Sequence, residues 1–280
     1  MINSACICGS GTMGTGIAIT FSLKRIPTIL FDTNQDNLEK AKEYIKKYIN
    51  KQNIKFIEKN TSFDFILDNI SFTTDIHDCK AELIIEAIIE NETIKTNLYK
   101  NLEAINHYNS IIASNTSSLS ISKLQQGLTK PENFAGLHFF NPAQIMKLVE
   151  VIKGTETSDR VMNILKETCE LIDKQPVICI DSPGFIVNRV ARPYYLEAMS
   201  LVEKGLCSIE EVDKLLENAG FKMGPFKLMD LIGLDINYNV SCLVWEQLDK
   251  PDRLRPSGLQ EEKVKNGELG IKTKKGFYTY

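Results

Sequence analysis

Several features that would indicate a particular class of protein are missing from this chain of 280 residues. None of its seven cysteines belongs to a Cys-x-x-Cys pair and their number is odd, so we expect reduced thiols and neither disulfides nor a metal site. The net charge is -3 without a long basic run, which argues against nucleic acid as a partner. No apolar run approaches the roughly 20 residues of a membrane span, and the first strand begins almost at once, leaving no room for a secretory signal. These absences predict a cytoplasmic protein outside the membrane.

A glycine-rich segment near the N-terminus is the first positive signal. Residues 2–8 predict a short buried strand, and residues 15–21 have the apolar spacing of a helix. Between them stand six residues in the G-x-G-x-x-G pattern of dinucleotide-binding folds: Gly9, Ser10, Gly11, Thr12, Met13 and Gly14. In such a loop Gly9 allows the tight turn, Gly11 lets the backbone approach a pyrophosphate, and Gly14 lets the helix pack on the strand. The N-terminus of the helix then offers N–H groups to the phosphates.

An acidic residue follows this loop at the spacing expected for a nucleotide site. Residues 28–31 predict a second strand, which ends at Asp32, eighteen residues after Gly14. A carboxylate there accepts hydrogen bonds from the adenosine ribose and repels a 2′-phosphate, so we expect NAD as the cofactor and not NADP. The alternative is a glycine turn without a ligand, which the strand–loop–helix context disfavours.

The pattern changes near residue 182. Up to that point, strand-like runs alternate with helical segments, and the later runs cover residues 83–87, 110–113, 134–140, 148–152 and 176–180. Beyond it the spacing is helical, in residues 185–204, 209–218 and 225–242. We therefore predict an α/β fold with a Rossmann-type dinucleotide-binding domain over residues 1–182 and an all-helical domain over residues 183–280. Asp181 or Ser182 is expected to cap the first of these helices, with Pro183 at its first position.

A histidine in an apolar segment is the first candidate for catalysis. His138 stands between Leu137 and Phe139, and taken alone it is more often a core histidine satisfied by a backbone carbonyl than a general base. Twelve residues later, Glu150 lies in an alternating strand. If the two side chains meet, the carboxylate would fix the imidazole tautomer and stabilise the imidazolium.

Other candidates stand where predicted strands end. Glu90 and Lys95 follow the strand at residues 83–87, where cofactors bind in open parallel sheets, but a helix-start acid and a solvated lysine are equally good explanations. Five small polar residues, 114–118, follow another strand and could cap a helix or line a pocket with hydrogen-bond donors.

The ordered set of these motifs resembles the L-3-hydroxyacyl-CoA dehydrogenases, and at this length the free-standing bacterial 3-hydroxybutyryl-CoA dehydrogenases. The segments that carry the likeness span nearly the whole chain: residues 9–14, 85–91, 113–118, 136–142, 146–151, 183–189, 223–226 and 276–278. The chain departs from the family's usual residues at Ser10, Ile271 and Lys274, and at Phe221 with Lys222.

The resemblance implies a role for each matching residue. His138 corresponds to the catalytic base and Glu150 to its carboxylate partner, while Ser117 and Asn188 hold the substrate's oxygens, with Ser117 also near the nicotinamide. The other implied NAD contacts are Glu90, Lys95, Asn141 and Lys272. Lys55 falls where the family places a lysine near the CoA phosphates.

The resemblance also implies an activity and partners. We expect NAD-dependent oxidation of a 3-hydroxyacyl-CoA and the reverse reduction, and a homodimer formed through the helical domain, with apolar side chains such as Leu196, Met199, Val202 and Leu231 as candidates for the contact. Two alternatives remain open: a dehydrogenase of a non-CoA hydroxy acid, of gulonate or carnitine type, and an NAD-binding protein without catalysis.

Overall fold

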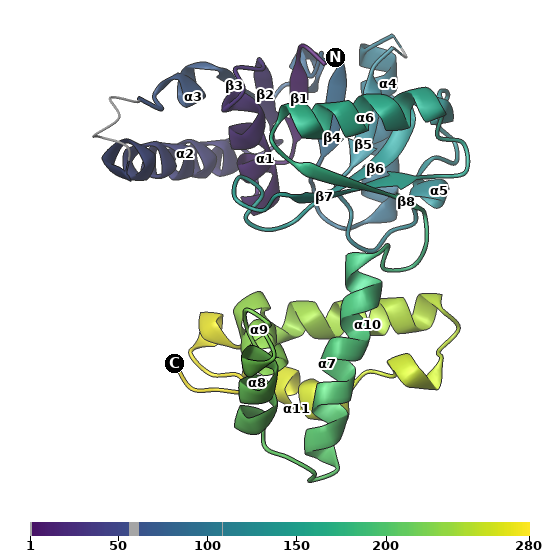
Figure 1. Cartoon of the computed structure of the whole chain (residues 1–280). Coiled ribbons are helices and arrows are strands. Elements are labelled where there is room, and N and C mark those ends of the chain that lie inside the picture. The colour runs from purple at the N-terminus through teal and green to yellow at the C-terminus, as the bar shows by residue number, and fades with distance from the viewer. Residues whose placement is uncertain (1, 56–61, 108) are drawn as a thin grey trace. The chain divides into compact units, whose positions relative to one another are not determined.

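The computed structural model describes residues 2–55, 62–107 and 109–280, and at Lys55 it describes the backbone alone. The chain divides into two compact units, Met1–Asp181 and Ser182–Tyr280, one residue from the expected boundary. The first unit runs from purple to teal and the second from green to yellow (Figure 1).

The first unit is built on one sheet of eight strands. The strands are β1 (Ala5–Cys8), β2 (Thr28–Phe31), β3 (Ile70–Thr73), β4 (Leu83–Glu86), β5 (Ile111–Ser114), β6 (Phe134–Phe139), β7 (Leu148–Lys153) and β8 (Gln175–Ile180). Their order is β3-β2-β1-β4-β5-β6-β7-β8, and every neighbouring pair is parallel except β6 and β7. The strand order reverses at β1, and beyond the carboxyl ends of β1 and β4 lies the crevice where such sheets bind ligands.

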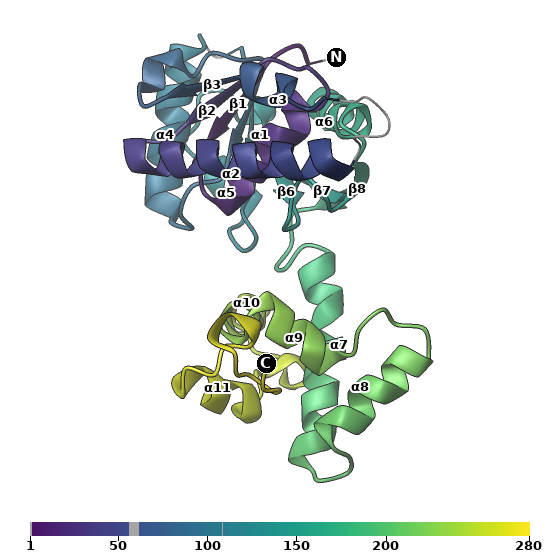
Figure 2. The same cartoon turned by 90° about the vertical axis from the view of Figure 1, so that its left-hand side faces the viewer.

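Helices cover both faces of this sheet. They are α1 (Thr12–Ser22), α2 (Gln35–Lys55), α3 (Phe65–Asp68), α4 (Glu92–Ile105), α5 (Ile121–Leu124) and α6 (Asp159–Leu171). Helices α1 and α6 share one apolar core with the odd-numbered residues of β1, such as Ala5 and Ile7. Helix α2 packs on α1 and α3 and forms an outer layer, visible in front of α1 in Figure 2.

Strand alternation sends the polar residues to the other face. In β6, Leu137 and Phe139 belong to the core with α1 and α6, so His138 projects to the opposite side. By the same register Glu86 in β4 and Ser114 in β5 lie side by side, as Cα partners. These polar side chains are buried nonetheless, because helix α4 lies over that face and places Tyr99 against Phe134 of β6.

The second unit is helical. Its helices are α7 (Val187–Glu203), α8 (Ile209–Asn218), α9 (Pro225–Ile232), α10 (Leu234–Gln247) and α11 (Gly258–Lys265). Two details of the prediction were wrong. Helix α7 begins at Val187 and not at Pro183, because Gly184 (φ 73°) and Phe185 (φ 45°) adopt left-handed conformations that a helix cannot contain. Gly233 (φ 103°) likewise divides the expected third helix into α9 and α10.

The apolar faces of this unit are partly used internally. Leu196 and Met199 are buried in the core of this unit. The expectation that they form an exposed contact surface was therefore wrong. Leu231, another of the expected side chains, is 55% exposed, and Leu206 and Leu215 are also exposed, at 68% and 69%. Across the described residues, no helix has both the length and the apolar character to cross a bilayer.

Candidate active site

The glycine loop between β1 and α1 has the shape that a dinucleotide requires. Gly9 has φ 103°, and a Cβ there would lie 2.6 Å from the carbonyl oxygen of Ala87. A Cβ on Gly14 would lie 1.7 Å from the carbonyl oxygen of Gly9, so only glycine lets α1 pack this closely. At Gly11, the N-cap of α1, a Cβ would meet no atom within 4 Å. The loop thus leaves open space next to the N–H groups that begin the helix, which fits a pyrophosphate.

Asp32 lies directly beyond β2 and bonds back to this loop. Its Oδ2 accepts hydrogen bonds from the backbone N–H of Ser10 at 2.9 Å and from the Ser10 hydroxyl at 2.8 Å. Its Oδ1 accepts the N–H of Asn34 at 3.0 Å. Burial by itself raises the pKa of Asp32, but these donors together hold it below the ordinary value. Asp32 is therefore an ionised acceptor at the edge of the predicted nucleotide site.

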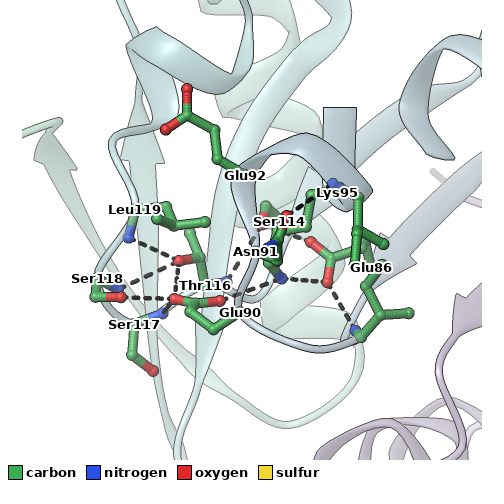
Figure 3. Close-up of polar contacts among 12 residues, drawn as sticks. Glu86, Glu90, Asn91, Glu92, Lys95, Ser114, Thr116, Ser117, Ser118 and Leu119 are labelled. Carbon is green, nitrogen blue, oxygen red and sulfur yellow. Dashed lines mark hydrogen bonds and ion pairs between the residues drawn. The ribbon is translucent and has the colours of Figure 1, made fainter. Parts of the chain in front are cut away.

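A buried ion pair stands between β4 and α4. Lys95 is 1% exposed and is not the solvated lysine of the alternative explanation. Its Nζ donates to Glu86 and lies 3.2 Å from Oε2 of Glu90 (Figure 3). The Oε2 of Glu86 also accepts the hydroxyls of Tyr99 at 2.5 Å and Ser114 at 2.8 Å. With its neighbours in place, the fully buried Glu86 carboxylate has the partners that a charge needs inside a protein.

Glu90 connects this pair to the loop after β5. Its Oε1 accepts hydrogen bonds from the Thr116 hydroxyl, from the Ser118 hydroxyl at 2.8 Å and from the backbone N–H of Ser117 at 3.2 Å (Figure 3). Burial raises the pKa of Glu90, but the charge of Lys95 and the two hydroxyls outweigh that effect and lower it. The polar loop is thus held by Glu90, whereas Ser120 supplies the cap of helix α5.

Ser117, His138 and Glu150 form a continuous hydrogen-bonded chain. The Ser117 hydroxyl lies 2.9 Å from Nε2 of His138, and Nδ1 of His138 lies 2.7 Å from Oε2 of Glu150. His138 and Glu150 are Cα partners in the antiparallel β6–β7 pair, which explains how residues twelve apart meet. They are 4% and 1% exposed. The predicted contact between histidine and glutamate is therefore confirmed, and a carboxylate on Nδ1 leaves Nε2 facing the serine.

Residues around His138 hold the end of β6 in place. The backbone N–H of Phe139 donates to Oδ1 of Asn115 at 2.8 Å, and the Phe140 ring lies 4.6 Å from the His138 ring, centroid to centroid. Asn141 follows as an exposed residue, joined to Pro142 by a cis peptide bond. Its expected contact with the cofactor stays a prediction.

Two predicted site residues belong to the second unit. Asn188 lies in the first turn of α7, and its carbonyl oxygen accepts a hydrogen bond from Nε of Arg192 at 3.0 Å. Nζ of Lys272 lies 2.5 Å and 2.7 Å from the two carboxylate oxygens of Asp235, at the start of α10. The roles expected of Asn188 and Lys272 toward substrate and cofactor stay predictions. Lys55 ends α2, and its side chain falls outside the described part of the structure.

Sequence reasoning missed the residues that support the site. Tyr99 lies in no motif, and Glu86, Ser114 and Asn115 lie in segments that were noted without a role being given to these residues, although a lone acid in the apolar run at residues 83–86 was a signal that it needs buried partners.

Three thiols in the core were also missed as a group. The sulfur atoms of Cys6, Cys8 and Cys79 lie within 4.8 Å of one another, all fully buried, a separation at which three sulfurs could hold a metal ion. Hydrogen bonds from Cys6 and Cys8 lower the pKa of Cys79 to about 5, so the three sulfurs also satisfy one another. Because Cys79 is distant in sequence, spacing alone gave no sign of this group.

Comparison with known proteins identifies one family over nearly the whole chain. Residues 4–182 match the family described as 3-hydroxyacyl-CoA dehydrogenase, NAD binding domain, and residues 184–280 match its C-terminal domain. The mitochondrial hydroxyacyl-coenzyme A dehydrogenase of Sus scrofa is 38% identical over 291 residues, covering 100% of this chain and 92% of the relative. The probable 3-hydroxybutyryl-CoA dehydrogenase of Deinococcus radiodurans is 38% identical over 276 residues, covering 98% and 99%.

Solved structures agree with these relatives. The (S)-3-hydroxybutyryl-CoA dehydrogenase of Ralstonia eutropha superposes with a TM-score of 0.94 at 35% identity, covering 100% of this chain and 99% of that one. The 3-hydroxybutyryl-CoA dehydrogenase of Escherichia coli K12 also has a TM-score of 0.94, at 38% identity, and this chain spans 60% of it. With a nucleotide loop, a buried histidine–glutamate pair and both family domains in order, the chain belongs to the NAD-dependent 3-hydroxyacyl-CoA dehydrogenase family.

Proposed function

We propose that this protein oxidises (S)-3-hydroxyacyl-CoA, with 3-hydroxybutyryl-CoA as the main substrate, to the 3-ketoacyl-CoA and catalyses the reverse reduction. The observation that carries the proposal is the chain from Ser117 through His138 to Glu150. It provides a base with one nitrogen directed to a small polar group and the other held by a buried carboxylate, in the same unit as the glycine loop.

The protein's own part in this reaction is proton transfer and orientation. In the oxidation, Nε2 of His138 takes the proton of the substrate hydroxyl, and Glu150 stabilises the imidazolium that forms. Bound NAD supplies the hydride acceptor at its nicotinamide. The hydroxyl of Ser117, already within hydrogen-bond distance of Nε2, orients the substrate oxygen. The family resemblance gives Asn188 the same task. In the reduction, His138 returns the proton to the keto oxygen.

A substrate comparison tests the proposal. We expect NADH oxidation with acetoacetyl-CoA and little with free acetoacetate, and a clear preference for NADH over NADPH. Equal rates with the free acid would instead favour a dehydrogenase of non-CoA hydroxy acids. Tight NADH binding without turnover of either substrate would indicate a protein without catalysis.

We further propose a homodimer formed through the second unit. Leu206, Leu215 and Leu231 are exposed by 68%, 69% and 55%, and burying them against a second copy of the chain would remove apolar surface from water. Sedimentation should give twice the mass of the chain, and a monomer mass at micromolar concentration would contradict the proposal. All seven cysteines are free thiols, which supports a location in the reducing cytoplasm, and a role in fatty acid metabolism follows from the substrate class.

A further inference from the structure

Ser10 is unusual within the glycine loop because its side chain has a bonding partner outside the loop. The residue is 5% exposed, and both its backbone N–H and its hydroxyl donate to the same oxygen, Oδ2 of Asp32, at 2.9 Å and 2.8 Å. An alanine or glycine at this position could supply only the first of these bonds. The loop thus contains a second, side-chain connection to the carboxylate beyond β2.

The two oxygens of Asp32 are used differently. A carboxylate oxygen accepts about two hydrogen bonds, and Ser10 alone provides two for Oδ2. Oδ1 receives the N–H of Asn34 at 3.0 Å and a long contact from Nδ2 of Asn37 at 3.4 Å. The bond from Asn37 is the longest of the four and therefore the easiest to replace, so Oδ1 is the oxygen that a ribose hydroxyl can approach, while Oδ2 keeps its two shorter bonds to Ser10.

We propose that Ser10 is a specificity-determining residue, whose hydroxyl holds the Asp32 carboxylate in place so that the site rejects a cofactor carrying a 2′-phosphate. This inference rests on the proposed contact of Asp32 with the adenosine ribose. To accept a 2′-phosphate, the carboxylate must turn away from it, because two anions in contact repel each other. When the Asp32 carboxylate turns, it loses both hydrogen bonds from Ser10. In a variant without the serine hydroxyl, it loses only the bond from the backbone N–H.

The test is a comparison of dissociation constants for NADH and NADPH, measured on the protein without substrate by cofactor fluorescence. For Ser10→Ala and Ser10→Gly we expect the preference for NADH to fall about three- to tenfold, less than a full charge-assisted bond is worth because the site is partly solvated. The same fall should appear in the ratio of the two kcat/KM values. Thr33→Ala is the matched control, since it removes an exposed hydroxyl adjacent to Asp32, and its preference should stay unchanged.

The Asp32→Ala variant separates the two proposals. If Ser10 acts through Asp32, Ser10→Ala should produce no further loss of preference in the Asp32→Ala background. An unchanged preference in both Ser10 variants, together with a large loss in Asp32→Ala, would overturn the role of Ser10 and leave that of Asp32 standing. An unchanged preference in Asp32→Ala itself would show that the assignment of Asp32 has failed. Thermal unfolding of each variant establishes that the loop substitutions still fold.

Discussion

Replacing Glu150 by glutamine tests the histidine–glutamate pair most directly. The substitution keeps the size of the side chain and an oxygen that can accept the Nδ1–H of His138, but it removes the charge. The two groups are 2.7 Å apart and 4% and 1% exposed, so water screens their interaction poorly. The variant therefore isolates the electrostatic contribution of Glu150 to a positively charged imidazole.

The expected loss follows from this geometry. Two unit charges at 2.7 Å attract by about 6 kcal/mol at an effective dielectric constant of about 20, which is an upper bound for a charge that forms only in part. Hydrogen bonds to charged groups contribute roughly 1.5–3 kcal/mol, against roughly 0.5–1.5 for neutral ones. Exchanging a charged for a neutral hydrogen bond thus costs at least about 1 kcal/mol, and the full charge interaction sets the upper bound of about 6 kcal/mol. We expect a loss of about 2 kcal/mol, which corresponds to about a 30-fold decrease in kcat.

The assay is NADH oxidation with saturating acetoacetyl-CoA, together with the dissociation constant of NADH. We expect the decrease in kcat with less than a twofold change in NADH binding, because Glu150 is not among the residues predicted to contact NAD. Glu167→Gln, an exposed carboxylate on α6, is the control and should behave as the parent. A Glu150→Gln protein that is folded and turns over within threefold of the parent would refute the argument that the charge assists His138.

Three further outcomes are expected. Ser117→Ala should lower kcat by about 10²-fold with little effect on NADH affinity, since it removes one oriented hydroxyl beside Nε2 of His138. A larger effect on KM than on kcat would show that Ser117 contributes only to substrate binding. Glu86→Gln should lower the free energy of unfolding in urea by about 3 kcal/mol, because the buried Lys95 loses its main counter-charge. An unchanged midpoint of the urea unfolding curve would contradict this. The pKa of Glu90 is lowered from the ordinary 4.5, so the stabilisation by its charge is complete above pH 4.5 and is lost as pH falls through the lower folded-state pKa. The difference in unfolding free energy between the parent and Glu90→Gln should therefore be constant near neutrality and vanish in acid. A difference that grows in acid would contradict the direction of this pKa shift.

The antiparallel pairing of β6 and β7 shows which part of the site the local sequence pattern predicts and which part it does not. Alternation placed His138 and Glu150 each on a defined face, but only the register of the two strands brings them opposite each other. The same holds for Glu86 and Ser114, which are partners across β4 and β5 and lie twenty-eight residues apart in sequence. A strand's pattern records which face is buried, and it does not record which residue of another strand will be its neighbour.

The sequence by itself determined the nucleotide loop, the acid at the end of β2 and the change from an α/β unit to a helical one. These features are local, since a turn needs glycine where φ is positive or packing is tight, and periodicity follows from the secondary structure of each segment. Only the tertiary structure decided that Lys95 is buried between Glu86 and Glu90, that Glu90 holds the loop carrying Ser117, and that Ser10 bonds to Asp32. The contacts of Glu90 with the Ser117 loop and of Ser10 with Asp32 join distant segments, and their partners are set by strand order, which no single stretch of sequence contains. The contacts of Lys95 are close in sequence, but its burial depends on how α4 packs on the sheet.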